Sequence, residues 1–364
     1  GQFNTLIGGL SGDALTTGLQ NVAIGYSALT TDDLGSHSVA VGPSALFSQN
    51  FATATNSYNT AVGSSAGAAV TTGVQNTLIG GLAGDALTDA DHNVAIGHAA
   101  LTTDTLGSRS VAIGNGALST QNHTTATSAY NTAVGDAAGE AVTTSVQNTL
   151  IGARAGQTLT TGDFNVVVGY LAGGYGVGML TASHNTILGS YSHTSAVGST
   201  QQIVIGHDVT GNGNETLCFG NGATDSAIAF GATSITAPSD QRYKEEIADA
   251  TAGLAFIKDL RPVTFKWKKE KDVPSDHSAY VEGSDTRVMN DYTNHGFIAQ
   301  EVKTAIDAHS DIKDGFDMWS EENREDKDGN AIANGRQRLG PSSLIPILVK
   351  AIQELEARIA TLEG

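Results

Sequence analysis

The chain has 364 residues, a formal net charge of −18 and one cysteine, Cys218. One cysteine excludes an intrachain disulfide, and the acidic balance argues against nucleic acid or anionic lipid as a partner. No apolar run reaches the roughly 18 residues of a membrane span, so membrane insertion is not expected, and no sequence pattern predicts a cofactor. The first residues start in the middle of a repeat and without Met, so we expect a longer protein with an N-terminal region missing here.

Charge is distributed unevenly along the chain. Residues 1–238 contain only two basic residues, Arg109 and Arg154, against 13 acidic ones. Residues 239–364 contain 17 basic and 24 acidic residues. This change of composition predicts a domain boundary near residue 238.

Internal repeats dominate residues 1–202. Units begin at Asn4, Asn21, Ser38 and Asn59, and the series restarts at Asn76, after steps of 17, 17, 21 and 17 residues. Each unit has a polar residue, a short stretch of branched apolar residues, a glycine and a loop. Branched residues favour strands and recurrent glycine disfavours helices. Stretches this short cannot bury a face alone, so the units must stack into a repetitive β-roll or β-helix-like shaft, and the fold class is mainly β.

The repeats resemble the β-roll heads of trimeric adhesins and the shafts of phage tail fibres, on units such as "SVAIG" and "NVAIG". The resemblance implies a homotrimer, and it leaves open whether three solenoids lie side by side or intertwine. Between residues 203 and 238 the units shorten to "IVIG" and "TLCFG". We expect a tapering β neck there.

Two insertions and scattered acidic and histidine residues are the candidate sites of the shaft. The 21-residue steps carry related insertions at 47–58 and 119–130, with Phe51 and His123 at corresponding places, and we expect both side chains at the tips of receptor-binding loops. Asp13 and Asp85 are equivalent in two copies, but the third copy has Gln157. Such an unrepeated pair does not predict a hydrolase site. The histidines lack an HxH spacing, so no metal site is predicted.

The segment "SDQRYK" opens the last 126 residues with Ser239, Asp240, Arg242 and Lys244. Together with "GFIAQEV" at 296–302 and "LVKAIQELEARI" near the C-terminus, it resembles the intramolecular chaperone domain of phage tail spikes and fibres, first associated with endosialidases. The resemblance implies self-cleavage by a Ser–Lys dyad, with Ser239 as nucleophile, Lys244 as base, Asp240 and Arg242 supporting the motif, and Pro238–Ser239 as the cleaved bond.

The same residues have a structural interpretation. Ser239 would cap a helix N-terminus, with Asp240 and Glu245 near the positive end of that helix. A second "SDTR" segment begins at Ser284, but Met289 stands where the lysine would be. That segment is therefore not expected to cleave.

The C-terminal residues have the heptad spacing of a coiled coil. Apolar side chains recur in steps of three and four, which predicts either a parallel three-stranded coil or a helix packed on its own domain. The predicted seam consists of Ile345, Leu348, Ile352, Leu355, Ile359 and Leu362.

These features predict three segments: a shaft at 1–202, a neck at 203–238, and a small α+β chaperone domain with self-cleaving activity at 239–364. The two resemblances imply a homotrimeric phage tail fibre in the virion tail, which we expect to bind a host saccharide or protein receptor and to join the rest of the tail through the missing region. The chaperone would be absent after cleavage, and self-cleavage is the only enzymatic activity expected. A cellular trimeric adhesin and a polysaccharide depolymerase spike are the alternatives.

Overall fold

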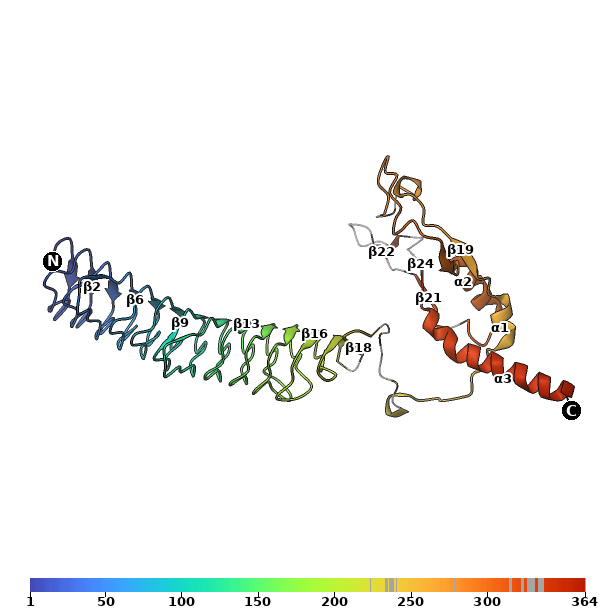
Figure 1. Cartoon of the computed structure of the whole chain (residues 1–364), viewed down its shortest axis with the longest axis horizontal. Coiled ribbons are helices and arrows are strands. Elements are labelled where there is room, and N and C mark those ends of the chain that lie inside the picture. The colour runs from blue at the N-terminus through green and yellow to red at the C-terminus, as the bar shows by residue number, and fades with distance from the viewer. Residues whose placement is uncertain are drawn as a thin grey trace. The chain divides into compact units, whose positions relative to one another are not determined.

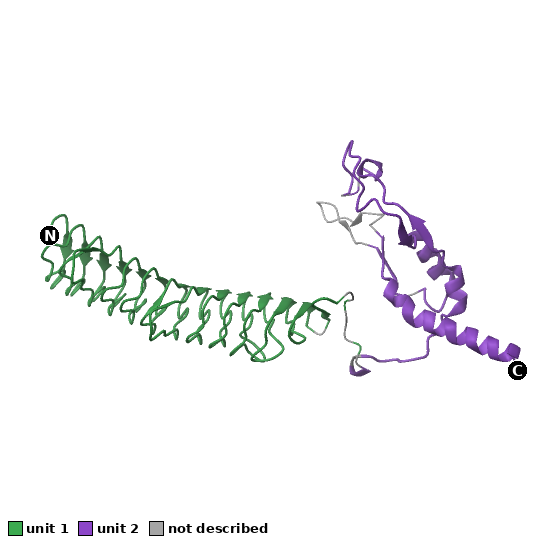
Figure 2. Cartoon of the chain, viewed as in Figure 1, with its two compact units in different colours: residues 1–240 green, residues 241–364 purple. Residues whose placement is uncertain are grey.

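The computed structural model describes residues 1–222, 224–232, 235, 239, 241–275, 277, 279–313, 316–321, 324–325, 331–332 and 337–363. The chain divides into two compact units, Gly1–Asp240 and Gln241–Gly364 (Figure 2). Each unit is described separately below. Pro238 and Asp240, both part of the predicted cleavage motif, lie outside the described residues.

The first unit is a β-solenoid, as the repeats predict (Figure 1). Its main sheet has 14 strands in chain order, and all pair in parallel except the last, which pairs antiparallel. Very short parallel pairs join β3 (Gly35–Ser36) to β5 (Thr55–Asn56) and β9 (Gly107–Ser108) to β11 (Thr127–Ser128). The strands of the main sheet are β1 (Thr5–Ile7), β2 (Val22–Ile24), β4 (Val39–Val41), β6 (Thr60–Val62), β7 (Thr77–Ile79), β8 (Val94–Ile96), β10 (Val111–Ile113), β12 (Thr132–Val134), β13 (Thr149–Ile151), β14 (Val166–Val168), β15 (Thr186–Leu188), β16 (Gln202–His207), β17 (Thr216–Asn221) and β18 (Ser226–Ala229).

The solenoid core is built from one strand position and the turn that follows it. Side chains alternate across a strand, so the middle residue of each three-residue strand points inward. Ala23, Ala95 and Leu150 are such residues, and all are completely buried. Small alanines and one larger residue per coil, such as Leu29 after β2, complete the interior. The main sheet runs without interruption across residue 202, because β16 pairs in parallel with β15.

A ladder of buried amide side chains connects the coils just before each strand. Asn93 illustrates the arrangement: its Nδ2 donates to the carbonyl oxygen of Gly107 at 2.9 Å, and its Oδ1 accepts the backbone N–H of Ser110 at 2.9 Å. The backbone N–H of Asn93 in turn donates to Oδ1 of Asn76 at 2.9 Å. Each amide therefore satisfies backbone groups that the three-residue strands leave unpaired inside the coil.

Where serine replaces asparagine in the ladder, a glutamine from the 21-residue step fills the space. Ser38 is one such position, and Gln49 donates from Nε2 to Ser38 Oγ at 2.8 Å and to Asp32 Oδ2 at 2.6 Å. Gln49 Oε1 accepts from Asn59 Nδ2 at 2.8 Å, which restores the link to the next coil. Burial raises the pKa of the Asp32 carboxyl, while hydrogen bonds from Gln49 and the Gly35 N–H act in the opposite direction. The same network recurs around Ser110 and Gln121.

A glycine after each strand allows the coils to approach closely. Gly97 has φ +135°, and a Cβ on it would lie 2.4 Å from the carbonyl oxygen of Gly114 in the next coil. Both the backbone conformation and the available space exclude a side chain there. The glycine in each "IG" or "VG" is therefore required by the stacking of the coils.

The second unit is a small α+β fold. Its elements are η1 (Gln241–Tyr243), α1 (Leu254–Asp259), β19 (Val263–Phe265), η2 (Glu270–Asp272), β20 (Asn294–Gly296), α2 (Ala299–Ala308), β21 (Trp319–Glu321), β22 (Arg324–Glu325), β23 (Ala331–Ile332), β24 (Gln337–Leu339), η3 (Pro341–Ser343) and α3 (Leu344–Glu363). Its strands form antiparallel pairs: β19 with β20, β21 with β24, and β22 with β23. Phe256 of α1 is fully buried among residues of α2 and α3.

Helix α3 both packs on its own unit and caps the start of α1. Leu344 and Ile347 belong to the core of the unit, and Ala351 one turn further is also buried. Glu354, on the same side, accepts the backbone N–H of Leu254 at 3.0 Å through Oε2. Since Leu254 is the first residue of α1, this carboxylate satisfies one of the N–H groups that a helix leaves unpaired at its start.

Replacing Asn93 with Ala removes one rung of the amide ladder. It leaves the carbonyl of Gly107 and the N–H of Ser110 unpaired inside the coil. Each buried unpaired group costs about 1–3 kcal/mol, so we expect the free energy of unfolding to fall by about 2–6 kcal/mol. Denaturant unfolding and hydrogen exchange of the Ser110 amide measure this effect.

The matched control is Asn115→Ala, the same chemical change on an exposed side chain. We expect the control to leave both the denaturation midpoint and the exchange rate of Ser110 unchanged. Equal effects of the two variants would mean that the ladder contributes nothing specific.

Candidate functional site

The predicted nucleophile and base lie on either side of the boundary between the two units. Ser239 is exposed and belongs to the first unit. Lys244 is also exposed, belongs to the second unit and directly follows η1, where its backbone N–H donates to the carbonyl of Gln241 at 3.1 Å. Arg242, within η1, is exposed as well. All three side chains of the motif that are described are therefore accessible to water in the single chain.

The exposure of Ser239 and Lys244 bears directly on the self-cleavage that the family resemblance implies. A serine hydroxyl is a weak nucleophile that needs an adjacent base. A lysine serves as that base when burial disfavours its protonated form. The single chain gives Lys244 no such environment, so a Ser239–Lys244 reaction requires a further burial step.

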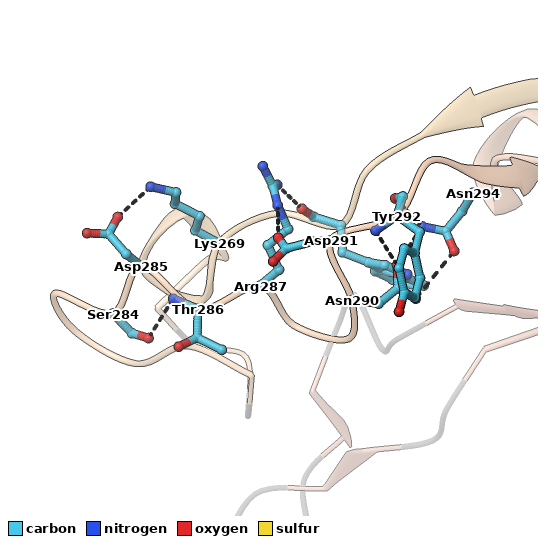
Figure 3. Close-up of polar contacts among 10 residues, drawn as sticks. Lys269, Ser284, Asp285, Thr286, Arg287, Asn290, Asp291, Tyr292 and Asn294 are labelled. Carbon is cyan, nitrogen blue, oxygen red and sulfur yellow. Dashed lines mark hydrogen bonds and ion pairs between the residues drawn. The ribbon is translucent and has the colours of Figure 1, made fainter.

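The second Ser-Asp-x-Arg segment has a different arrangement, shown in Figure 3. Ser284 donates from Oγ to Glu270 Oε2 at 2.6 Å, so its hydroxyl contacts a carboxylate. Lys269 and Lys271 both pair with the next residue, Asp285, at 2.5 Å and 2.7 Å. These two lysines hold the pKa of Asp285 at about 2, mainly through their hydrogen bonds to it.

Arg287 completes that segment. It donates to the backbone carbonyl of Trp267 at 2.5 Å and pairs with Asp291 at 2.7 Å. The repeated motif thus forms an ion-paired loop next to β19, and its serine has no lysine partner among the contacts described. This agrees with the absence of a lysine five residues after Ser284 in the sequence.

The "GFIAQEV" segment forms the centre of the second unit. Gly296 ends β20, and Ala299 begins α2. Val302 of α2 is buried in the core, whereas Glu301 points outward and forms a two-pronged ion pair with Arg261. The motif that carries the resemblance is therefore the junction between a strand and a core helix.

Helix α3 exposes the whole predicted coiled-coil seam. Its core contacts use Leu344, Ile347 and Ala351, which lie on another side of the helix. The six seam residues are between 42% and 86% exposed in the single chain. The two alternatives for this helix are thus not exclusive, because it packs on its own unit and still presents an apolar stripe. The stripe consists of Ile345, Leu348, Ile352, Leu355, Ile359 and Leu362.

The expectation that Phe51 and His123 occupy exposed loop tips is wrong. Each is only 5% exposed and comes two residues after the buried glutamine of its insertion. The backbone N–H of His123 donates to Asp104 Oδ1 at 3.0 Å, and its Nε2 atom is buried without a partner. Exposed side chains of the insertions include those at 52–54 and 124–126, together with Tyr58 and Tyr130.

Two structural features of the shaft went unrecognised in the sequence. The sequence pattern marks the asparagine of each unit only as the polar residue before a strand. Its recurrence at a fixed place in each unit is the signal for a buried ladder. The pairing of Asp32 with Gln49 had a weaker signal, namely that both recur, as Asp104 and Gln121, in the second copy.

Some classes of site are not found in the part of the chain that the structure describes. No helix there has the length and apolar character of a bilayer span. Nor do three His, Cys, Asp or Glu side chains come together there as ligands for a metal ion.

Comparison with protein families gives one match. Residues 239–311 match the family model described as chaperone of endosialidase. The match begins at Ser239 and includes the "GFIAQEV" segment; α3 lies beyond it. Neither the curated proteins nor the solved structures include a match to this chain. Residues 239–311 thus match the chaperone-of-endosialidase domain, and a β-solenoid shaft followed by this domain fits a tail-fibre or tail-spike type of protein with a C-terminal intramolecular chaperone.

Proposed function

We propose that this chain forms a homotrimeric fibre of a phage tail that attaches to a host cell, and that its C-terminal domain assembles the fibre and then releases itself. The observation that carries the proposal is the family match that starts at Ser239, directly after the solenoid. The remaining support comes from the exposed surfaces of the two units.

Trimerisation is supported by the apolar stripe of α3. An Ile/Leu stripe with alternating steps of three and four residues is the surface that helices bury in a coiled coil. The core contacts of α3 leave this stripe uncovered over the length of the helix. A parallel bundle of three α3 helices removes it from water and fixes three chain ends at one level.

Self-cleavage follows from trimerisation in this proposal. Assembly buries Lys244, which then accepts the proton of the Ser239 hydroxyl. The Ser239 oxygen attacks the carbonyl carbon of Pro238, the peptide bond between them breaks, and the proton passes to the freed amine of Ser239. Water then hydrolyses the resulting ester and separates shaft from chaperone. Because Lys244 is exposed in the single chain, cleavage reports that assembly has occurred.

Host attachment is assigned to the exposed part of the two insertions. The segments 52–54 and 124–126 consist of Ala and Thr, carry no charge and are exposed. Tyr58 stacks on His37 with 5.1 Å between ring centroids, and Arg109 lies 5.8 Å from the centre of the Tyr130 ring. Neutral polar loops beside exposed aromatic rings suit a saccharide or a protein receptor.

The cleavage proposal predicts a fragment that begins at Ser239. Denaturing mass analysis of the expressed full chain is the measurement. We expect the fragment to disappear in Ser239→Ala, which lacks the nucleophile, and in Lys244→Met, which lacks the base but keeps a long side chain. Ser284→Ala is the matched control and should cleave like the original chain, since Ser284 contacts Glu270 instead of a lysine. Undiminished cleavage in Ser239→Ala or Lys244→Met would rule out the dyad.

The attachment proposal predicts that the exposed insertion tips are needed for binding to host cells. Replacing residues 52–54 and 124–126 with Gly-Ser-Gly should leave the fibre trimeric and abolish adsorption, because Gln49 and Gln121 keep their buried contacts. Adsorption to host cells and native mass are measured together. A fibre that stays trimeric and adsorbs normally would place the receptor site elsewhere.

A further inference from the structure

The outer face of the solenoid sheet is free of charge over its whole length. The first and third residues of each three-residue strand point outward, on the opposite side from the buried middle residue. From β1 to β17 these two outward columns contain only Thr, Val, Ile, Leu and Phe. All 13 acidic residues of segment 1–238 lie outside the parallel strands of the main sheet. In a chain with a net charge of −18, the absence of acidic residues from this face indicates that the face does not remain exposed to water.

This face is uncovered in the single chain. Ile79, Ile151, Leu188 and Ile205 of the third column are 38%, 39%, 39% and 41% exposed, whereas the middle residues of the same strands are fully buried. The third column is apolar throughout, whereas the first column mixes Thr with Val, Ile and Leu, and an exposed apolar column of this length marks an interaction site.

The dimensions of the face restrict what covers it. Thirteen parallel strands at about 4.8 Å spacing make a face about 60 Å long, and three residues of strand make it about 10 Å wide. The covered area is then on the order of 600 Å² for each chain, close to the roughly 800 Å² per partner of a stable protein interface. A partner must therefore be straight, apolar and as long as the shaft. Another copy of the shaft has all three properties.

We infer that the shafts of the trimer are three separate solenoids packed side by side through this face. The inference rests on the homotrimer of the proposed function and specifies how its shafts meet. Intertwining is disfavoured because every strand of the main sheet from β1 to β17 already pairs with its neighbours within its own chain, which leaves no unpaired edge along the length of this sheet for another chain.

The same face does not determine the register of the chains. Its first column reads Thr, Val, Val, Thr from β1 to β6, and the same order recurs from β7 to β12. A shift by one coil places Thr against Val, whereas a shift by four coils restores the original pairing. The face therefore favours lateral contact but permits a whole-block slip, which leaves the choice of register to another part of the chain.

Site-specific cross-linking of the full chain tests the inference. In a Cys218→Ala background, which removes the single native thiol, Ile96→Cys places a thiol on the outer face and Thr125→Cys places one on an exposed insertion. Ile24→Cys, four coils nearer the N-terminus on the same column, is a second face variant in case one fails to fold. Native mass gives the number of chains, and a short bis-maleimide reports which thiols are close.

The expected result is a trimer in which Ile96→Cys and Ile24→Cys give covalent chain pairs while Thr125→Cys remains uncrosslinked. A trimer in which neither face variant cross-links overturns the side-by-side arrangement and leaves the proposed trimer standing. A full chain that is monomeric by native mass overturns the proposed homotrimer, and this inference with it.

Discussion

Each coil of the shaft depends on one buried side-chain amide. A strand of three residues makes too few hydrogen bonds to satisfy the backbone of a 17-residue coil, and water does not reach the interior. The asparagine before the strand solves this problem by bonding to the backbone of its own coil and to that of the next, as Asn93 does. Where the ladder has serine, the coil lengthens to 21 residues and brings in Gln49 or Gln121 to reach across the gap. The insertions thus help to stabilise the shaft through these two glutamines. The exposed tips of the insertions are not part of that buried network.

The regularity that makes this ladder possible also creates a problem for assembly. Coils with the same amide, the same inward residue and the same outward columns fit one another at several offsets, and register is weakly specified when a pattern repeats. The shaft contains no local feature that penalises a shift by a 72-residue block. Helix α3 is different, since its stripe occurs once in the chain and forms from contacts close in sequence, which fold early. In the proposed trimer, the second unit would supply the alignment that the first unit lacks.

The sequence predicts the architecture well and the sites less well, for physical reasons. The repeat spacing requires stacked strands, and the family motifs place a chaperone after Ser239; the solenoid and the family match confirm both. The place of Phe51 and His123 in the two insertions predicts exposed loop tips, but both side chains are buried, because the burial of a single loop residue depends on how the whole coil folds. Lys244 is exposed in the single chain, so the burial that the proposed reaction needs would have to come from an assembly, which neither the sequence nor a single chain describes. Glu354 caps α1 across 100 residues of sequence, and no local pattern reveals such a pair.

In the proposed trimer, the C-terminal unit aligns three shafts that cannot align themselves. The most direct measurement of this alignment compares residues 1–238 produced alone with the same residues released from a full chain, by native mass and by resistance to detergent. We expect aggregates from the segment produced alone and a persistent trimer from the released segment, because a fully folded solenoid trimer has a high barrier to unfolding. A soluble trimer in a single register from residues 1–238 produced alone would contradict this expectation.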